Sequence, residues 1–152
     1  MNSTSVFALL CAAALLVGAL IPIQAATNAA LSKSIESVFY ASLVLFIVGL
    51  LFISIFLAVQ TEPPPPMRAF QSAPVYGYLG GFIVATYVIA ITYLAPRIGV
   101  GNAICFIVTG QILSAVIIDH FGLFGAVVHH LNWRRILGIL LMIAGLFLAR
   151  RM

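Results

Sequence analysis

One stretch of the chain, residues 98–118, runs for 21 residues without a charged side chain. At about 1.5 Å per residue, a helix of this length crosses a bilayer core of about 30 Å. Gly110 and Gln111 lie near its middle, and polar groups at membrane depth are costly unless they face protein or water. The stretch therefore predicts a transmembrane helix with one face turned to a lined interior, and neighbouring helices that build it.

The composition extends this prediction to the whole chain. Of its 152 residues, 64% are hydrophobic and 7% are charged, whereas soluble domains average about 25% charged residues. A soluble core of this size cannot bury so much apolar surface, so we expect an integral membrane protein. The Lys and Arg residues lie between or beyond the apolar runs, which indicates contact with lipid headgroups and not with nucleic acid. Cys11 and Cys105 fall inside apolar runs and are interpreted as lipid-buried thiols.

The alternation of apolar and polar segments predicts an all-α protein with five transmembrane helices in a single domain, 1–152. The helices are expected at about 6–31, 38–59, 74–95, 98–118 and 131–149. Four consecutive prolines stop a helix and favour extended chain, so residues 60–73 are expected to form a stiff loop. The last apolar run has only 14 uncharged residues, 136–149, and spans a membrane only if the helix begins at Leu131 and its arginines reach back to the headgroups.

The corner at Pro96 and Arg97 is expected to be a tight turn that makes the third and fourth helices antiparallel neighbours. Arg97 would anchor this corner at the interface or hold an anionic group. Two glycine pairs allow close helix contact: Gly77 with Gly81, and Gly138 with Gly145 in the last helix.

Polar residues inside the first helix are candidates for a substrate cavity. Gln24 and Asn28 are four residues apart and share one helical face beside Pro22. A helix broken next to polar groups is a recurring way to build a transport site. Gln111, with Gly110 beside it, is a third candidate. The alternative for all of these positions is hydrogen bonding between helices, and the three amides are predicted to converge on one interior.

Asp119 ends the fourth helix and has two interpretations. It either lies among headgroups, solvated or paired with Arg134 or Arg135, or it titrates and couples transport to protons. Neither a cofactor nor a metal is expected, because no Cys or acid stands at supporting spacing around the pair of neighbouring histidines, His129 and His130.

The sequence resembles the YdcZ-type family within the drug/metabolite transporter superfamily over nearly its whole length. The matching residues are Gln24-x-x-x-Asn28-x-x-Leu31, Gly80-Gly81, Pro96-Arg97-x-Gly99, Gly110-Gln111, Asp119-x-Phe121-Gly122 and Arg135-x-x-Gly138 with Gly145. The resemblance implies an exporter of small molecules in the bacterial inner membrane. Family members occur singly, in pairs and as fused duplicates, which implies two oppositely oriented five-helix units. The related small multidrug transporters carry a buried glutamate in the first helix, and this chain has none there.

We therefore expect a multi-pass secondary transporter that exports a small organic solute by alternating access. Its partners would be the bilayer, the solute and a second, inverted copy of the chain. Lys and Arg number three on the N-terminal face and four on the other, too even to select one orientation. The alternative function is a membrane scaffold or accessory subunit. An enzyme is not expected, because the helix cores hold no plausible pair of nucleophile and base.

Overall fold

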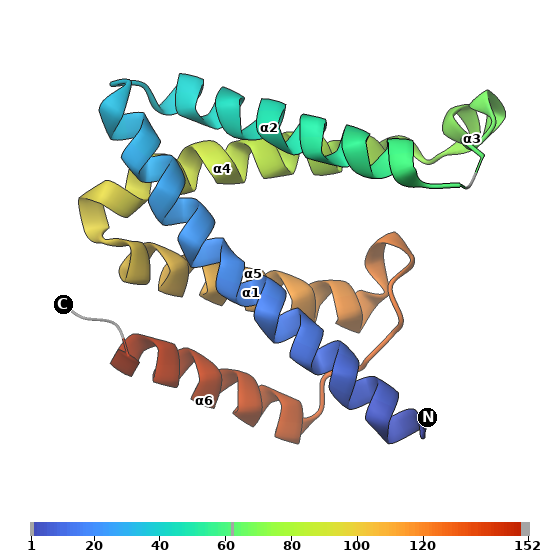
Figure 1. Ribbon diagram of the computed structural model, residues 1–152. Coiled ribbons are helices and arrows are strands. Elements are labelled where there is room, and N and C mark those ends of the chain that lie inside the picture. The colour runs from blue at the N-terminus through green and yellow to red at the C-terminus, as the bar shows by residue number, and fades with distance from the viewer. Residues whose placement is uncertain (1, 62, 150–152) are drawn as a thin grey trace. The chain divides into compact units, whose positions relative to one another are not determined.

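The computed structural model describes residues 2–61 and 63–149, and all regular elements among them are helices (Figure 1). The chain divides into two compact units, Met1–Pro96 and Arg97–Met152. Within these described ranges, four helices are long and apolar enough to cross a membrane: α1, α2, the helical segment that contains α4, and α5. The prediction of an all-helical membrane protein is therefore confirmed, whereas the fifth crossing stays a prediction.

The first unit begins with one long helix, α1 (Ser3–Ser34), which continues through Pro22. Proline has no backbone N–H, so it leaves the carbonyl of Gly18 without its helical donor. Neighbouring groups in a membrane protein can satisfy such a carbonyl, which is why the helix persists. Pro22 is consequently a weak point in an otherwise continuous helix.

A short turn joins α1 to α2 (Val38–Val59), and the two helices pack against each other. Glu36 adopts a left-handed conformation, with φ of 53°, which reverses the chain in few residues. Ser37 then caps α2, because its Oγ accepts a hydrogen bond from the N–H of Tyr40 at 3.3 Å.

The segment between α2 and the next long helix is more structured than the sequence predicts. After the prolines, whose last member Pro66 is extended with ψ of 150°, the chain forms the short helix α3 (Met67–Ser72). A 3₁₀ turn, η1 (Val75–Tyr78), follows it. The Tyr78 hydroxyl donates to the carbonyl of Phe70 at 2.7 Å and ties the two pieces together.

Helix α4 (Leu79–Ile98) completes the first unit and buries one stripe of its surface. The stripe repeats every three or four residues, as a helix packed on one side requires. It consists of Val88, Ile91, Thr92 and Ala95.

The break after α4 is not at Pro96 and Arg97, where the sequence predicts a turn, but at Gly99. The fixed φ of proline fits the helix, so α4 runs on past it. Gly99 has φ of 84°, a conformation that residues with side chains rarely adopt, and it ends the helix.

The second unit is a pair of packed helices, α5 (Val100–Phe121) and α6 (Trp133–Ala149). The turn η2 (Leu123–Gly125) and an irregular loop connect them. Gly122 ends α5 in the left-handed conformation, and a Cβ atom there would lie 2.7 Å from Cγ2 of Val128. This glycine is therefore required both by backbone conformation and by space.

Helix α6 begins at Trp133 and not at Leu131, so it has 17 described residues. At about 1.5 Å per residue it is about 26 Å long, slightly shorter than a typical bilayer core. Arg150 and Arg151, the expected anchors at its end, lie outside the described residues. The helix could span a membrane only with help from flanking residues.

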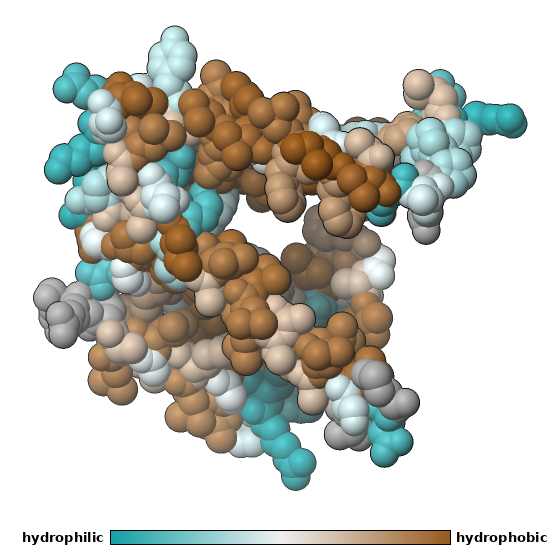
Figure 2. All heavy atoms as spheres, viewed as in Figure 1, coloured by the Kyte–Doolittle hydropathy of each residue, from teal (hydrophilic) through white to brown (hydrophobic). Residues whose placement is uncertain are grey.

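Most long apolar side chains point outward from the helices, as a lipid-facing surface requires. Figure 2 shows hydrophobic side chains along the length of α2. Phe52 is 71% exposed and Val59 is 77% exposed, far more than any water-soluble helix of this composition would tolerate. This exposed surface is what a bilayer covers in a multi-pass membrane protein.

Candidate functional site

A groove of about 460 Å³ lies between α1 and α2 in the first unit. Its walls are mostly aliphatic, and its polar groups all come from α1. The lining residues are Leu20, Ile23, Gln24, Thr27, Asn28, Leu31, Val44, Leu45 and Val48. Two of the three predicted cavity amides, Gln24 and Asn28, thus line one groove beside Pro22.

Asn28 joins α1 to α4. Its side chain is only 5% exposed, and its Nδ2 donates to Oγ1 of Thr92, which is fully buried, at 2.5 Å. The bond connects residues 64 positions apart in the sequence and fixes the two helices within the first unit. Asn28 therefore serves as a contact between helices while it also lines the groove.

Gln24 differs from Asn28 because the nitrogen of its side-chain amide forms no hydrogen bond to another helix among the described residues. Its Nε2 is buried and has no hydrogen-bond partner within residues 2–61 and 63–149. The neighbouring hydroxyl of Thr27 is already used, since it donates to the carbonyls of Ile23 at 3.0 Å and Gln24 at 3.1 Å. Tyr87 on α4 has a second buried polar atom, Oη, that lacks a partner in the described part of the chain.

Thr92→Val should destabilise the protein by about 1–2 kcal/mol, because it leaves the buried amide of Asn28 without its partner. The matched control is Thr86→Val on the same helix, where the hydroxyl is exposed and donates only to its own backbone at Phe82. Reversible unfolding of the purified protein in bicelles would measure both. Equal losses for the two variants would show that the bond between the helices contributes nothing.

Gly110 and Gln111 lie in the second unit, in the middle of α5, and both are exposed. A Cβ atom at Gly110 would meet nothing within 4 Å. The nearby hydroxyl of Thr109 donates to the carbonyl of Cys105, one turn earlier, at 2.8 Å. Gln111 and the two amides of α1 belong to different units, so their convergence stays a prediction.

A polar cluster holds the loop between α5 and α6. Arg135 forms an ion pair with Asp119 and also donates to the carbonyl of His129 at 2.7 Å. The N–H of His129 in turn donates to the carbonyl of Asp119 at 2.9 Å. Asn132 caps the start of α6 by accepting from the N–H of Arg135 at 2.8 Å. One arginine thus fastens both the end of α5 and the start of α6.

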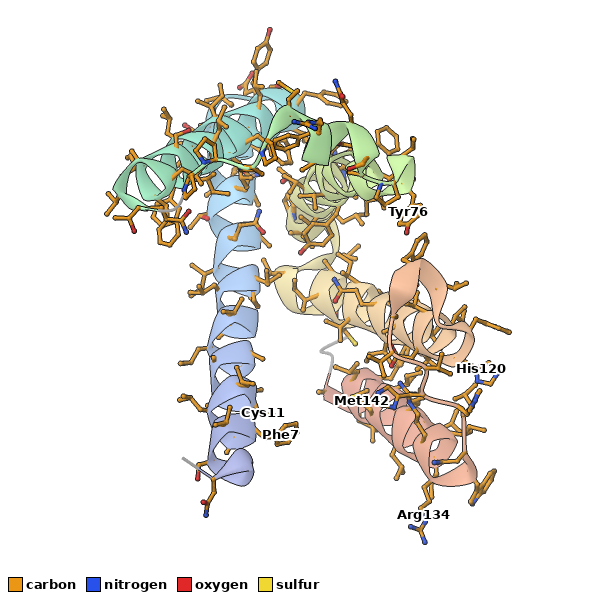
Figure 3. The ribbon with its side chains drawn as sticks, turned by 90° about the vertical axis from the view of Figure 1, so that its right-hand side faces the viewer. Phe7, Cys11, Tyr76, His120, Arg134 and Met142 are labelled. Atoms are coloured by element: carbon orange, nitrogen blue, oxygen red, sulfur yellow. The ribbon has the colours of Figure 1, made fainter. Side chains whose placement is uncertain are left out.

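Histidines reinforce the same loop. Nδ1 of His120 accepts a hydrogen bond from the N–H of Leu131 at 3.2 Å, and its ring packs edge-on against that of His130. Figure 3 shows His120 near the loop and Arg134 projecting away from it. Within the described residues, no group of three or more His, Cys, Asp or Glu could hold a metal ion. The histidines therefore act as structural neighbours of Asp119.

The predicted glycine pairs have open space around them among the residues that the structure describes. Gly77 lies in η1 and Gly81 in α4, so the two do not share one continuous α-helix. Gly138 and Gly145 are two turns apart on α6. A Cβ atom at any of these four positions would meet nothing within 4 Å. Arg97 is exposed in the last turn of α4.

Several residues of the groove region and of the polar cluster between α5 and α6 were not predicted from the sequence. Thr92 and Tyr87 are not among the predicted site residues, because hydroxyls that make an apolar helix partly polar do not by themselves indicate a site. The buried repeat of α4, with Thr92 one turn after Val88, was the available clue. His129 and Asn132 take part through backbone and capping contacts, which depend on loop geometry that the sequence does not reveal.

Residues 9–148 match the model of the family described as "Putative inner membrane exporter, YdcZ". No curated protein and no solved structure matches the chain. The family match confirms the resemblance predicted from the sequence. The family description implies a multi-pass inner-membrane transporter rather than an enzyme, in agreement with the apolar helices. The chain belongs to the YdcZ family of inner-membrane exporters.

Proposed function

We propose that this protein is a secondary-active exporter that moves a small organic solute by alternating access. The observation that carries the proposal is the groove between α1 and α2, which Gln24, Thr27 and Asn28 line among aliphatic side chains. Polar groups at membrane depth are costly unless they face protein or water, so polar residues that line a groove there favour a transport site. The solute would lie in this groove, near the middle of α1.

Pro22 provides the place where α1 can bend. It stands two residues before Gln24, and it already lacks one hydrogen bond of the helix. Bending at a proline moves one half of a helix against the other at low cost. We propose that the two halves of α1 reorient during transport, while the bond from Asn28 to Thr92 holds the C-terminal half on α4.

Asp119 is proposed as the coupling group. Protonation of its carboxylate would remove the charge that attracts Arg135 and would weaken one of the contacts that hold the loop between α5 and α6. Loss of the proton would restore the ion pair. A proton gradient could in this way bias the loop between two states, as local charge changes do in other switches.

The working unit is proposed to be an antiparallel homodimer in the bacterial inner membrane. The middle of α5 carries an exposed face of small and polar residues, which lipid covers poorly and protein covers well. The face consists of Gly110, Gln111, Ser114 and Ala115. We expect this face to complete the substrate cavity, where Gln111 would join Gln24 and Asn28.

Purified protein in liposomes should take up solutes from a broad panel of small organic molecules when a pH gradient is imposed. The expected signal is accumulation well above that in protein-free liposomes, which collapses when an ionophore removes the gradient. Circular dichroism and gel filtration of the same sample would establish that it is folded. If folded protein moves none of the solutes, a role as scaffold or accessory subunit replaces the proposed export.

A further inference from the structure

We propose that His120 is a second proton-binding group of this protein, and that a proton on its Nδ1 breaks the hydrogen bond that holds the loop between α5 and α6 at Leu131. The inference rests on the proposed function and deepens it, because it adds a regulatory group to the loop that Asp119 is proposed to control. It is carried by one hydrogen bond, whose direction is incompatible with a protonated imidazole.

The hydrogen bond runs from the backbone N–H of Leu131 to Nδ1 of His120 over 3.2 Å. An imidazole nitrogen accepts a hydrogen bond only when it carries no proton, so the proton of the neutral ring lies on Nε2. In the protonated ring both nitrogens are donors. The Nδ1–H would then face the N–H of Leu131, and the bond would be lost. The loop with this bond formed, which we call the closed loop, and a protonated His120 therefore exclude each other.

Loss of this bond would affect the start of α6. Leu131 lies two residues before Trp133, the first residue of that helix, and His120 lies in the last turn of α5. The bond thus connects the end of one helix with the approach to the next. The His120 ring also packs edge-on against that of His130, with the centroids 5.8 Å apart. Protonation would therefore change the contacts of two consecutive loop residues.

The charges near His120 come from both helix ends and from the loop. Besides His120, the ionisable groups of residues 119–135 are Asp119, His129, His130, Arg134 and Arg135. Asp119 is the single acid among them, and it is paired with Arg135. Arg134 projects away from the loop (Figure 3). Because the ion pair does not involve the His120 ring, the pair and the Leu131 bond can respond to pH separately.

The sign of the pH effect follows from proton counting. The closed loop binds one proton fewer at His120 than the open loop, so closure is favoured at high pH. It is weakened as the pH falls through the range in which histidines ordinarily take up a proton, about pH 8 to 5. Protonation of Asp119 would act in the same direction, by removing the charge that attracts Arg135. His120 would account for the pH dependence that remains in Asp119→Asn.

NMR of the isotope-labelled protein in micelles tests the inference through two signals, the ring nitrogens of His120 and the backbone amide of Leu131. As the pH is lowered from about 8 to about 5, Nδ1 should change from an acceptor to a protonated nitrogen. The Leu131 amide should shift with the same midpoint. Its protection from hydrogen exchange, relative to an unstructured peptide at each pH, should fall about fivefold. A Leu131 amide that does not follow the His120 ring would overturn the inference.

Substitutions at His120 separate the acceptor from the ring. His120→Asn places an amide oxygen as many bonds from the backbone as Nδ1, so Leu131 should stay protected over the whole pH range. His120→Gln carries its amide one bond further out and should lower the protection at every pH. His130→Gln is the control and should titrate as the wild-type protein does. Titration of Leu131 that persists in His120→Asn would contradict the inference, and if that variant does not fold, the wild-type titration still decides.

The inference and the proposed function can fail separately. A Leu131 amide that titrates with His120, in a protein that moves no solute in liposomes, would keep the proton site and remove the exporter. Flux driven by a pH gradient, with a Leu131 amide that is insensitive to His120, would keep the exporter and overturn the inference. The Leu131 titration should survive in Asp119→Asn, and its loss there would assign the proton to Asp119 instead.

Discussion

Asp119→Asn is expected to give folded protein whose transport has lost most of its dependence on pH. The substitution removes the group that would exchange a proton and nearly keeps its shape. We expect the part of solute flux that a pH gradient drives to be largely lost, because the amide of asparagine cannot exchange the coupling proton. The measurement is flux in liposomes across about pH 5 to 8, compared with the wild-type protein.

The stability of the variant should change little, for reasons that lie in the cluster itself. Arg135 and Asp119 are 28% and 33% exposed, and ion pairs this accessible to solvent contribute about 0–1 kcal/mol. Arg135 also keeps its hydrogen bond to the carbonyl of His129 when the carboxylate is gone. A large effect on coupling with a small effect on folding is what distinguishes a coupling group from a structural one.

Glu36→Gln is the matched control, because it removes another carboxylate from an exposed turn between two helices. It should leave the pH profile of transport as in the wild-type protein. An unchanged profile in Asp119→Asn as well would return Asp119 to the interfacial residues. Loss of folding in Asp119→Asn would instead assign the ion pair a structural role.

The long helices were the most predictable part of this protein. An uninterrupted apolar run fixes a transmembrane helix nearly by length alone, and the run at 38–59 has the same bounds as α2. Glycine also predicts reliably where the backbone must turn left-handed, as at Gly122. The resemblance to a transporter family, carried by residues spread over the chain, is confirmed by the family match.

Local contacts between short segments were less predictable. Helix α3 forms in a stretch expected to be extended, because good helix formers follow the last proline and Tyr78 holds the piece in place. The sequence pattern also predicted the corner at Pro96, although Pro96 lies within α4 and the positive φ that ends the helix belongs to Gly99. In both cases the outcome depends on neighbours that are not adjacent in sequence.

In the candidate site, too, the positions of the residues were predictable and their contacts were not. Helical spacing alone placed Gln24 and Asn28 on one face of α1, and both line the groove. Spacing could not distinguish their roles, since one amide is bonded to Thr92 on α4 and the other is unpaired in the described chain. The different hydrogen bonding of the two amides depends on how α1, α2 and α4 pack, and the sequence of one helix does not reveal this packing.

A reporter fused to the C-terminus should be active on both sides of the membrane, because we propose that the chain inserts in two orientations and pairs as an antiparallel homodimer. With five crossings, Arg68, Arg134 and Arg135 lie on one face. On the other lie Lys33, Arg97, Arg150 and Arg151, so the count is three against four. Orientation follows the excess of Lys and Arg in short loops, and a difference of one is too small to choose. Two reporters, one active only inside and one only outside, measure the distribution.

The length of α6 makes this experiment decisive, because the charge count depends on whether that helix crosses. If the 17 residues of α6 stay on one side, Arg150 and Arg151 join Arg68, Arg134 and Arg135, and the count becomes five against two. Such a bias predicts a single orientation. Signal from both reporters therefore supports five crossings and dual insertion together, whereas signal from one reporter would require a separate, oppositely inserted partner.

Two kinds of substitution test orientation and pairing separately: added lysines change the orientation of the chain, and added bulk changes the pairing of two copies. Lysines introduced on one face, for example near Arg68 in the loop before α4, should abolish one of the two signals and with it the dimer. Gly138→Leu and Gly145→Leu should leave both signals but weaken the dimer, since a Cβ atom at either position meets no described neighbour within 4 Å and a longer side chain would obstruct the proposed partner. Ala144→Leu is the control on the same helix. Crosslinking in native membranes measures pairing, and a dimer unaffected by either glycine variant would move the interface away from this face of α6.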